Sequence, residues 1–285
     1  AKLSPALSDL IDGNGSLEQA LPAGSVIARK PGEVPPPGYT LFQRNEYNAS
    51  LVWEEKAPIS STRRVYNGMA VLNGEIYLVG GNGSEEIEKG VQKYNPITNT
   101  WSTIASMNER RKLVAAVAFN GKIFAIGGSG GGVTNASTEF YDPATQLWTY
   151  GPALPLPTSG ASAISHNGKV YLMGGYNGSS YLNQVLELSS ETGQWISKTS
   201  MPNSGDGHKL VNFQNKIWAI GGIVAGTGSS AKAEIYDPVL DSWSAAPNMT
   251  KQRHWPVAWS TPEGIFVGSG FTTGNSTIHQ SLEFF

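Results

Sequence analysis

The sequence of 285 residues contains no cysteine, so disulfide bonds and thiolate chemistry play no part in its fold or activity. Charged residues make up 15% of the chain, against a usual quarter, and the formal net charge is -2. Nucleic-acid binding requires clustered Lys and Arg, so the lack of a basic run argues against nucleic acid as a partner. No apolar run is long enough to span a bilayer, so we expect no membrane insertion.

The N-terminal stretch "AKLSPALSDL" shows no signal peptide, which we interpret as a mature chain or an excised domain. The lack of cysteine fits a bacterial exported protein, although many cytosolic proteins also lack it. We therefore expect an extracellular or periplasmic location, with a cytoplasmic one as the alternative. We also expect a monomer.

The sequence contains an internal repeat. The stretch "VYNGMAVLNGEIYLVGG" (65–81) returns as "VAAVAFNGKIFAIGG", "ASAISHNGKVYLMGG" and "KLVNFQNKIWAIGG". The glycine after the second apolar run recurs every 47 residues, at Gly80, Gly127, Gly174, Gly221 and Gly268. A tryptophan recurs every 47 or 48 residues, at Trp53, Trp101, Trp148, Trp195 and Trp243. Two independent markers share one period, which indicates a repeat architecture.

Each repeat has the pattern of four short antiparallel strands. An Asn-Gly pair such as Asn73-Gly74 splits two apolar runs and predicts a type I′ hairpin, whose central residues need positive φ. Asp-Pro, as in "FYDPATQLW", predicts the turn between the third and fourth strands. No helical periodicity is visible. Four strands in about 47 residues predict an all-β propeller with one sheet, or blade, per repeat.

These marks resemble the kelch-repeat family, whose propeller blades carry the Gly pair, a tyrosine and a tryptophan at this spacing. The tyrosines are Tyr94, Tyr141 and Tyr236, and the resemblance covers nearly the whole chain. The third full repeat, "LELSSETGQW", lacks the tyrosine and the proline, and Ser269 replaces the second glycine of the last Gly pair. The resemblance implies an all-β, six-bladed propeller of kelch type.

The repeat spacing divides the chain into one domain of six blades. Complete blades are predicted over 59–107, 108–154, 157–201 and 202–249, and a last blade of three strands over 251–285. Residues 10–57 are predicted to form a degenerate blade that ends near Trp53. "AKLSPAL" resembles "WTYGPAL", with Ala1 at the tryptophan position, so residues 1–8 are predicted to close the ring as the fourth strand of the last blade.

Candidate ligand-binding residues lie where the propeller varies. In propellers the loops between strands two and three and the linkers between blades surround one mouth of the central channel. These loops differ from blade to blade here, which is typical of recognition on a fixed scaffold. Equivalent linker arginines would suit an acidic ligand, unless they bridge blades or solvate the rim, and aromatics would stack on sugars. The candidates are Arg64, Arg111, Arg253, His208, His254, Trp255, Tyr66, Tyr176 and Tyr181.

The sequence offers no convincing catalytic or metal site. His208 and His254 begin inner strands and would serve either as a general base or as ordinary packing residues. No histidine pair has the spacing of metal ligands, so we predict neither a metal nor another cofactor. "GGSGG" contains a serine at position 129, yet no helix pattern follows it as a nucleophile elbow requires. We therefore assign no catalytic residue.

Three functions remain open at this point. The first is a non-catalytic binding module that recognises a glycan or a protein through its variable loops. The second is an enzyme similar to the six-bladed kelch sialic acid mutarotases, in which the rim arginines would bind a carboxylated sugar. The third is an intracellular kelch domain that recruits a protein partner, as in ubiquitin-ligase adaptors. We favour the first, because function depends on a site and not on the fold.

Overall fold

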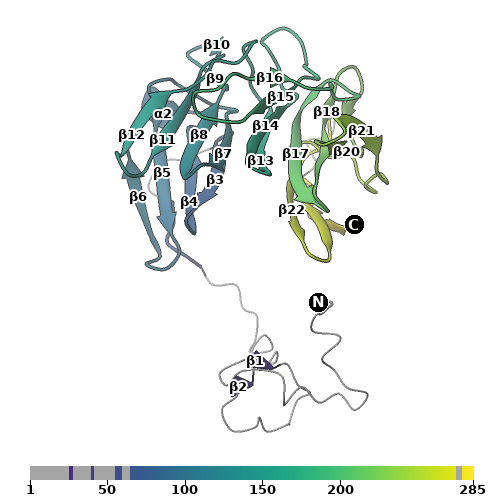
Figure 1. The fold of residues 1–285 in the computed structure, drawn as a ribbon, viewed down its shortest axis with the longest axis horizontal. Coiled ribbons are helices and arrows are strands. Elements are labelled where there is room, and N and C mark those ends of the chain that lie inside the picture. The colour runs from purple at the N-terminus through teal and green to yellow at the C-terminus, as the bar shows by residue number, and fades with distance from the viewer. Residues whose placement is uncertain (1–25, 28–39, 42–54, 60–64, 274–277) are drawn as a thin grey trace. The chain divides into compact units, whose positions relative to one another are not determined.

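The computed structural model describes residues 26–27, 40–41, 55–59, 65–273 and 278–285. The chain divides into two compact units, Ala1–Lys56 and Ala57–Phe285. The second unit consists of antiparallel sheets arranged as a fan, in which β3, β7, β13, β17 and β22 lie innermost (Figure 1). This arrangement confirms the predicted all-β propeller fold.

Three of the blades have four strands each, paired in sequence order from the inside outward. The first contains β3 (Gly68–Leu72), β4 (Glu75–Val79), β5 (Val91–Asn95) and β6 (Thr100–Ile104). The second contains β7 (Ala115–Phe119), β8 (Lys122–Ile126), β11 (Thr138–Asp142) and β12 (Leu147–Tyr150). The third contains β13 (Ser162–His166), β14 (Lys169–Met173), β15 (Val185–Leu188) and β16 (Ile196–Ser197).

The last two blades differ in strand number. The fourth contains β17 (Gly205–Phe213), β18 (Lys216–Val224), β20 (Ala233–Asp237) and β21 (Ser242–Ala245), and β19 (Gly228–Ser229) also pairs with β18. The fifth has three strands, β22 (Val257–Thr261), β23 (Gly264–Gly268) and β24 (Leu282–Phe284). The variable loop of the second blade adds a hairpin of β9 (Ser129–Gly130) and β10 (Val133–Thr134).

The hairpin turns follow from the Asn-Gly pairs. Asn73, Asn120 and Asn167 have φ values of 53°, 47° and 47°, and the glycine after each also has positive φ. Asparagine and glycine adopt this left-handed conformation at low cost, so two-residue turns join the first two strands of these blades. The fourth blade turns at Gln214 and Asn215, with φ of 50° and 59°.

Blades pack against one another through wedges of apolar side chains. Between the first and second blades, Tyr77 and Val79 of β4 meet Ile123 and Ala125 of β8 in one buried cluster. Three similar clusters lie between the successive pairs of blades that follow. The strands alternate between faces, so each sheet contributes side chains to the clusters on both of its sides.

The Gly pair locks each blade to the linker that follows it. In the second blade Gly127 has a φ of 60°, and Gly128 N–H donates to the Thr158 carbonyl at 2.8 Å. A Cβ atom on Gly127 would lie 2.1 Å from that carbonyl oxygen, so only glycine fits. The same bond joins Gly81 to Arg111, Gly175 to Gly205 and Gly222 to Arg253.

The described residues form five blades, whereas the sequence predicted six. The predicted sixth blade, 10–57, falls mostly outside the described residues, and so does the predicted closing strand, 1–8. Within the first unit, β1 (Val26–Ile27) pairs with β2 (Thr40–Leu41) in parallel, not in the antiparallel manner of a blade. Prolines 35–37 between these strands lack the N–H groups that a ladder uses.

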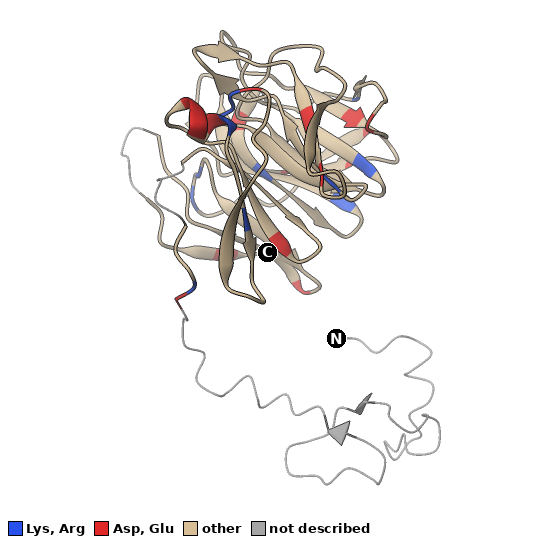
Figure 2. Cartoon of the chain, turned by 90° about the vertical axis from the view of Figure 1, so that its left-hand side faces the viewer, with Lys and Arg blue, Asp and Glu red and all other residues tan. Residues whose placement is uncertain are grey.

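The structure also contains one short helix that the sequence pattern did not predict, α2 (Glu85–Lys89), within the variable loop of the first blade. A Lys89–Glu85 ion pair of 3.0 Å supports it at the i, i+4 spacing, and Arg110 Nε donates to Glu88 at 2.7 Å. Helix α2 is the most acidic element visible in Figure 2, where charged residues are otherwise scattered.

Candidate functional site

A series of backbone hydrogen bonds runs from blade to blade around the centre of the propeller, on the side of the variable loops. Its members stand at one repeat position, two residues before the innermost strands of four blades and inside β17 in the fourth blade, and all have positive φ: Tyr66, Leu113, Gly160, Gly207 and Trp255. From Leu113 onward, each N–H donates to the carbonyl of the preceding member, which gives four hydrogen bonds of 2.7, 2.8, 3.1 and 2.7 Å. We call these five residues the inner ring. It fixes the spacing of the blades at the mouth of the channel.

A cavity of about 180 Å³ lies directly inside the inner ring. Its walls come from equivalent positions of the described blades, residues 67–69, 114–116, 161–163, 208–210 and 255–256. Most of these side chains are small or apolar. Lys209 is the only charged residue among those that line this cavity, and burial lowers the pKa of its ammonium group. We call this space the central cavity.

Two aromatic members of the inner ring meet at the mouth. Tyr66 and Trp255 approach edge to face, with ring centroids 6.2 Å apart. Tyr66 is exposed and Trp255 is half-buried. The indole lies against Gly207, where an added Cβ would come within 2.9 Å of Trp255 Cε2. Because residue 207 is a glycine without a side chain, the indole of Trp255 has room to pack against it.

Asp206 adds an acidic group next to the inner ring. Its Oδ2 lies against Gly160, where a Cβ would approach it to 2.8 Å. Burial raises the pKa of Asp206 to about 6. Its Oδ1 is buried and has no hydrogen-bond partner in the part of the chain that the structure describes. Its charge also contributes, after burial, to the raised pKa of Tyr181.

Tyr176 and Tyr181 form a second aromatic pair on the same side. Their ring centroids are 5.3 Å apart, and both side chains are half-buried. Tyr176 bridges to Ser159 of the linker and to Tyr181 within its own loop. The loop of the third blade therefore folds back toward the linker residue next to Gly160 of the inner ring.

The two candidate histidines have different surroundings. His208 is buried, its Nε2 has no partner among the described residues, and burial lowers its pKa to about 4, so the ring is neutral. His254 Nδ1 lies 2.9 Å from Ser229 Oγ, which in turn lies 2.6 Å from Thr273 Oγ1. Burial lowers the pKa of His254 as well. His208 lines the central cavity together with Trp255, and His254 immediately precedes Trp255 in the chain.

Arg111 and Arg253 do not lie exposed on the rim, where the sequence suggested that an acidic ligand would bind. Arg111 is fully buried and donates to Glu139 Oε1 at 2.9 Å and to the Gly127 carbonyl at 2.6 Å. Arg253 is fully buried in the same way and donates to Glu283 Oε1 at 2.7 Å and to the Ser269 carbonyl. Both guanidinium groups tie a linker to the blade that follows it, which differs from the expected acidic ligand and also from the two alternatives, a bridge between blades and a solvated rim. Arg64 lies outside the described residues.

Asp206 and Lys209 were not among the candidates selected from sequence. A signal was nevertheless available, because the positions equivalent to Lys209 in the two preceding blades are Ala115 and Ser162. A charged side chain at a repeat position that is otherwise small departs from the structural pattern. The recurrence of arginine at one repeat position did not identify a binding site, because such recurrence is as typical of a structural contact as of a binding site.

The described residues contain no group of three or more His, Cys, Asp or Glu that could hold a metal ion. In the same part of the chain, no helix is long and apolar enough to cross a membrane.

Comparison with known proteins identifies the repeats. A sequence model of the "Kelch motif" matches residues 63–108, 110–155, 157–202 and 205–250, which together exceed half of the chain. Kelch-like protein 42 from Mus musculus is 34% identical over 97 residues, which are 32% of this chain and 19% of that protein. The match therefore spans about a fifth of that relative.

Solved structures share the fold. The structure of YjhT superposes with a TM-score of 0.72 at 18% identity, over 82% of this chain and 84% of that one. A fungal alcohol oxidase of the AA5 family, in complex with copper, superposes with a TM-score of 0.55 at 17% identity, over 79% and 63% of the two chains. At such identities the likeness extends to the fold alone.

Proposed function

The chain belongs to the kelch-motif family, and from this premise we propose that it is a non-catalytic binding module that recognises a neutral glycan at the mouth of the central cavity. The observation that carries the proposal is the convergence of Tyr66, Trp255 and Asp206 on the inner ring. Aromatic faces stack on the apolar C–H faces of a sugar, and a carboxylate accepts hydrogen bonds from its hydroxyl groups.

The charge distribution favours a neutral ligand over an acidic one. Arg111 and Arg253 have their donors committed to Glu139 and Glu283. The carboxyl of Asp206 instead lies against Gly160 of the inner ring, where it would repel an acidic sugar when ionised. The proposal also allows a protein ligand that binds through the same loops. We further propose that the protein is exported and monomeric. The glycan is favoured because a sugar ring matches the small aromatic mouth.

A glycan array probed with the intact chain tests the proposal. We expect a neutral glycan to bind, and we expect Trp255→Ala and Tyr66→Ala to weaken that binding about tenfold or more, since each removes an aromatic contact. Trp259→Ala is the matched control, because Trp259 is a half-exposed tryptophan of the same blade that stacks on Phe266, away from the inner ring. Equal loss in all three variants would contradict a site at the mouth.

The affinity for the glycan should depend on pH, in a direction that the pKa of Asp206 determines. Hydroxyl donors of a ligand stabilise the ionised form of Asp206, whose pKa is raised by burial to about 6. Binding should therefore be stronger at pH 7.5 than at pH 5, where the carboxyl is protonated. Calorimetric titration at the two pH values measures the difference, and Asp206→Asn should remove it. A pH dependence unchanged in Asp206→Asn would exclude this carboxyl from the site.

A mutarotase-like enzyme that acts on a carboxylated sugar is the second candidate. It is favoured by one observation, that Asp206 has a pKa near 6 and so could exchange protons near neutral pH. Lys209 in the central cavity would supply a cation for the sugar carboxylate. NMR measurement of sialic acid anomerisation separates the candidates, because a binding module leaves the rate at its uncatalysed value.

A further inference from the structure

An arginine from the linker binds a glutamate of the third strand in two of the blades. In the second blade, Arg111 Nε and Nη2 donate to Glu139 Oε1 at 3.2 and 2.9 Å. Its Nη1 donates to the Gly127 and Ser137 carbonyls at 2.6 and 2.9 Å. Arg253 makes the equivalent contacts in the fifth blade. One carboxylate and two carbonyl groups therefore form a recurring guanidinium site, of the kind that a planar cation fits best.

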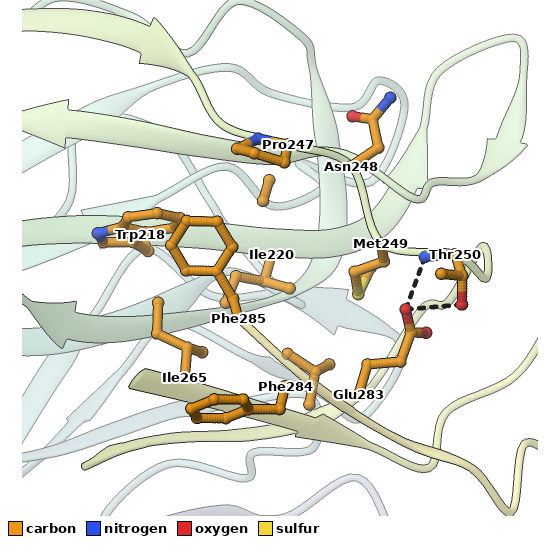
Figure 3. Close-up of a pocket in the computed structure, with 12 residues that line it drawn as sticks. Trp218, Ile220, Pro247, Asn248, Met249, Thr250, Ile265, Glu283, Phe284 and Phe285 are labelled. Atoms are coloured by element: carbon orange, nitrogen blue, oxygen red, sulfur yellow. Dashed lines mark hydrogen bonds between the residues drawn. The ribbon is translucent and has the colours of Figure 1, made fainter. Parts of the chain in front are cut away.

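The same glutamates also accept hydrogen bonds from the residue three positions before the arginine. Asn108 N–H donates to Glu139 Oε2 at 2.7 Å. In the fifth blade, Thr250 N–H and Oγ1 donate to Glu283 Oε2 at 2.6 and 2.8 Å (Figure 3). Each of these two carboxylates is thus bound through both of its oxygens.

The fourth blade keeps the glutamate but lacks both donors. Glu234 of β20 stands at the repeat position of Glu139 in β11. Gly205 stands at the position of the arginine, and Pro202, three residues earlier, has no N–H. In the part of the chain that the structure describes, the Glu234 carboxylate accepts one hydrogen bond, from Asn203 Nδ2 at 2.7 Å.

A cavity of about 20 Å³ lies beside Glu234, and we call it the Glu234 cavity. Gly205 lines it without a side chain. Its walls also include the residues at the repeat positions of the three groups that bind Arg111 in the second blade, Gly221, Lys232 and Glu234. Every residue that lines it lies between 201 and 234, so the linker and the fourth blade enclose it by themselves. A space of this size admits a narrow head group and excludes a sugar ring.

The surroundings of the cavity favour a cation. The Glu234 side chain supplies a carboxylate that its one hydrogen bond leaves without a counter-charge. His208 lines the cavity, and burial lowers its pKa to about 4, so the neutral ring does not repel a cation. The ammonium group of Lys232 lies 3.1 Å from Asn203 Oδ1 and forms no ion pair with Glu234 among the described residues. Lys232 is exposed and Glu234 is half-buried, so the cavity is reached from solvent.

We propose that the Glu234 cavity binds the guanidinium group of a ligand, which replaces the arginine that the linker itself provides in the second and fifth blades. The group donates to Glu234 Oε1 in place of the Asn203 amide. Either a free guanidino compound or the arginine side chain of a protein ligand supplies this chemistry. The cavity is separate from the central cavity, although His208 lines both, so the proposal does not rest on glycan binding.

Methylguanidinium is the first probe. It is titrated into the ¹⁵N-labelled intact chain at constant ionic strength, up to about 50 mM, which is far below denaturing concentrations. We expect saturable NMR shifts of the Gly221 and Lys232 amides and of the Asn203 side-chain amide, with a dissociation constant of about 1–10 mM. Methylurea is the neutral isostere and should cause no saturable shift at these resonances, because the carboxylate attracts the charge.

Two variants locate the binding. Glu234→Gln keeps the size of the side chain and removes its charge, so it should weaken methylguanidinium at least tenfold. Glu86→Gln is the matched control, because it changes the net charge equally at an exposed residue of α2 and should leave the affinity unchanged. The NMR spectra of both variants also report whether they are folded. The comparison with methylurea uses the unaltered chain and does not depend on the folding of either variant.

A pair of tripeptides distinguishes the two sources of the guanidinium group. The capped peptide Gly-Arg-Gly is compared with its citrulline counterpart, in which the side chain has the same shape and no charge. Tighter binding of the arginine peptide than of methylguanidinium would assign the site to a protein ligand, and weaker binding would assign it to a free guanidino compound. Equal shifts with methylguanidinium and methylurea, no saturable shift at the three resonances, or full affinity in Glu234→Gln would overturn the proposal.

Discussion

A single repeat position shows how the propeller joins its linkers to its sheets. Arg111 and Arg253 each carry a guanidinium group from a linker to a glutamate of the third strand. In the third blade the equivalent residue is Thr158, and its Oγ1 accepts a hydrogen bond from Gln184 Nε2 at 2.9 Å. The neutral pair of Thr158 and Gln184 therefore connects the linker to the blade as the Arg–Glu pairs do elsewhere. The charge is required only where the partner is a buried carboxylate.

Arg111→Ala should be strongly destabilising for this reason. Glu139 is completely buried, so removal of Arg111 leaves its carboxylate without its counter-charge. We expect the free energy of unfolding to fall by about 3–5 kcal/mol, as measured by chemical denaturation. Arg110→Ala is the control, because Arg110 is partly exposed in its pair with Glu88 and solvent screens that interaction, so it should cost less than Arg111→Ala. Similar losses in both variants would show that Arg111 has no special structural role.

At the scale of elements, the Gly pair couples each hairpin to the linker after it, and this coupling is testable. In Gly127→Ala the new Cβ would meet the Thr158 carbonyl at 2.1 Å, which forces the linker away. We expect a loss of about 3 kcal/mol or more in the free energy of unfolding. Gly121→Ala has similar φ in a turn with nothing within 4 Å, so it should cost only about 1–2 kcal/mol. Equal losses in the two variants would mean that the linker moves away from the new Cβ atom at little energetic cost.

The elements could be predicted from sequence because their determinants are local and repeated. The Asn-Gly turns, the Gly pairs and the tryptophans recur at one spacing, and each reports a backbone conformation or a packing position. The site could not be predicted in the same way. Whether Arg111 faces a ligand or Glu139 depends on a contact across 28 residues, and the meeting of Tyr66 with Trp255 joins the first blade to the fifth. The unpaired oxygen of Asp206 has no sequence signature at all.

At the scale of the whole molecule, the two end blades expose apolar faces that the inner blades bury. Met69 and Val71 of β3 are each 55% exposed, whereas Ala116 and Ala118, at the same repeat positions of β7, pack against the cluster between blades. On the fifth blade, Val257 and Trp259 of β22 are 55% and 44% exposed. Apolar sheet faces of this kind normally meet a partner. We propose that residues 10–57, the predicted sixth blade, cover them.

Removal of residues 1–56 tests that proposal. The remaining chain, 57–285, keeps all five described blades, so it should stay folded by circular dichroism. With its end faces uncovered, it should bind the dye ANS more strongly than the intact chain and should self-associate in sedimentation experiments. Replacing Val71 and Trp259 together by Ser should reduce both effects, since the two residues supply exposed apolar area on opposite ends of the fan. If dye binding and sedimentation were the same with and without residues 1–56, the first unit would not cover these faces, and a five-bladed propeller with open ends would be the form in solution.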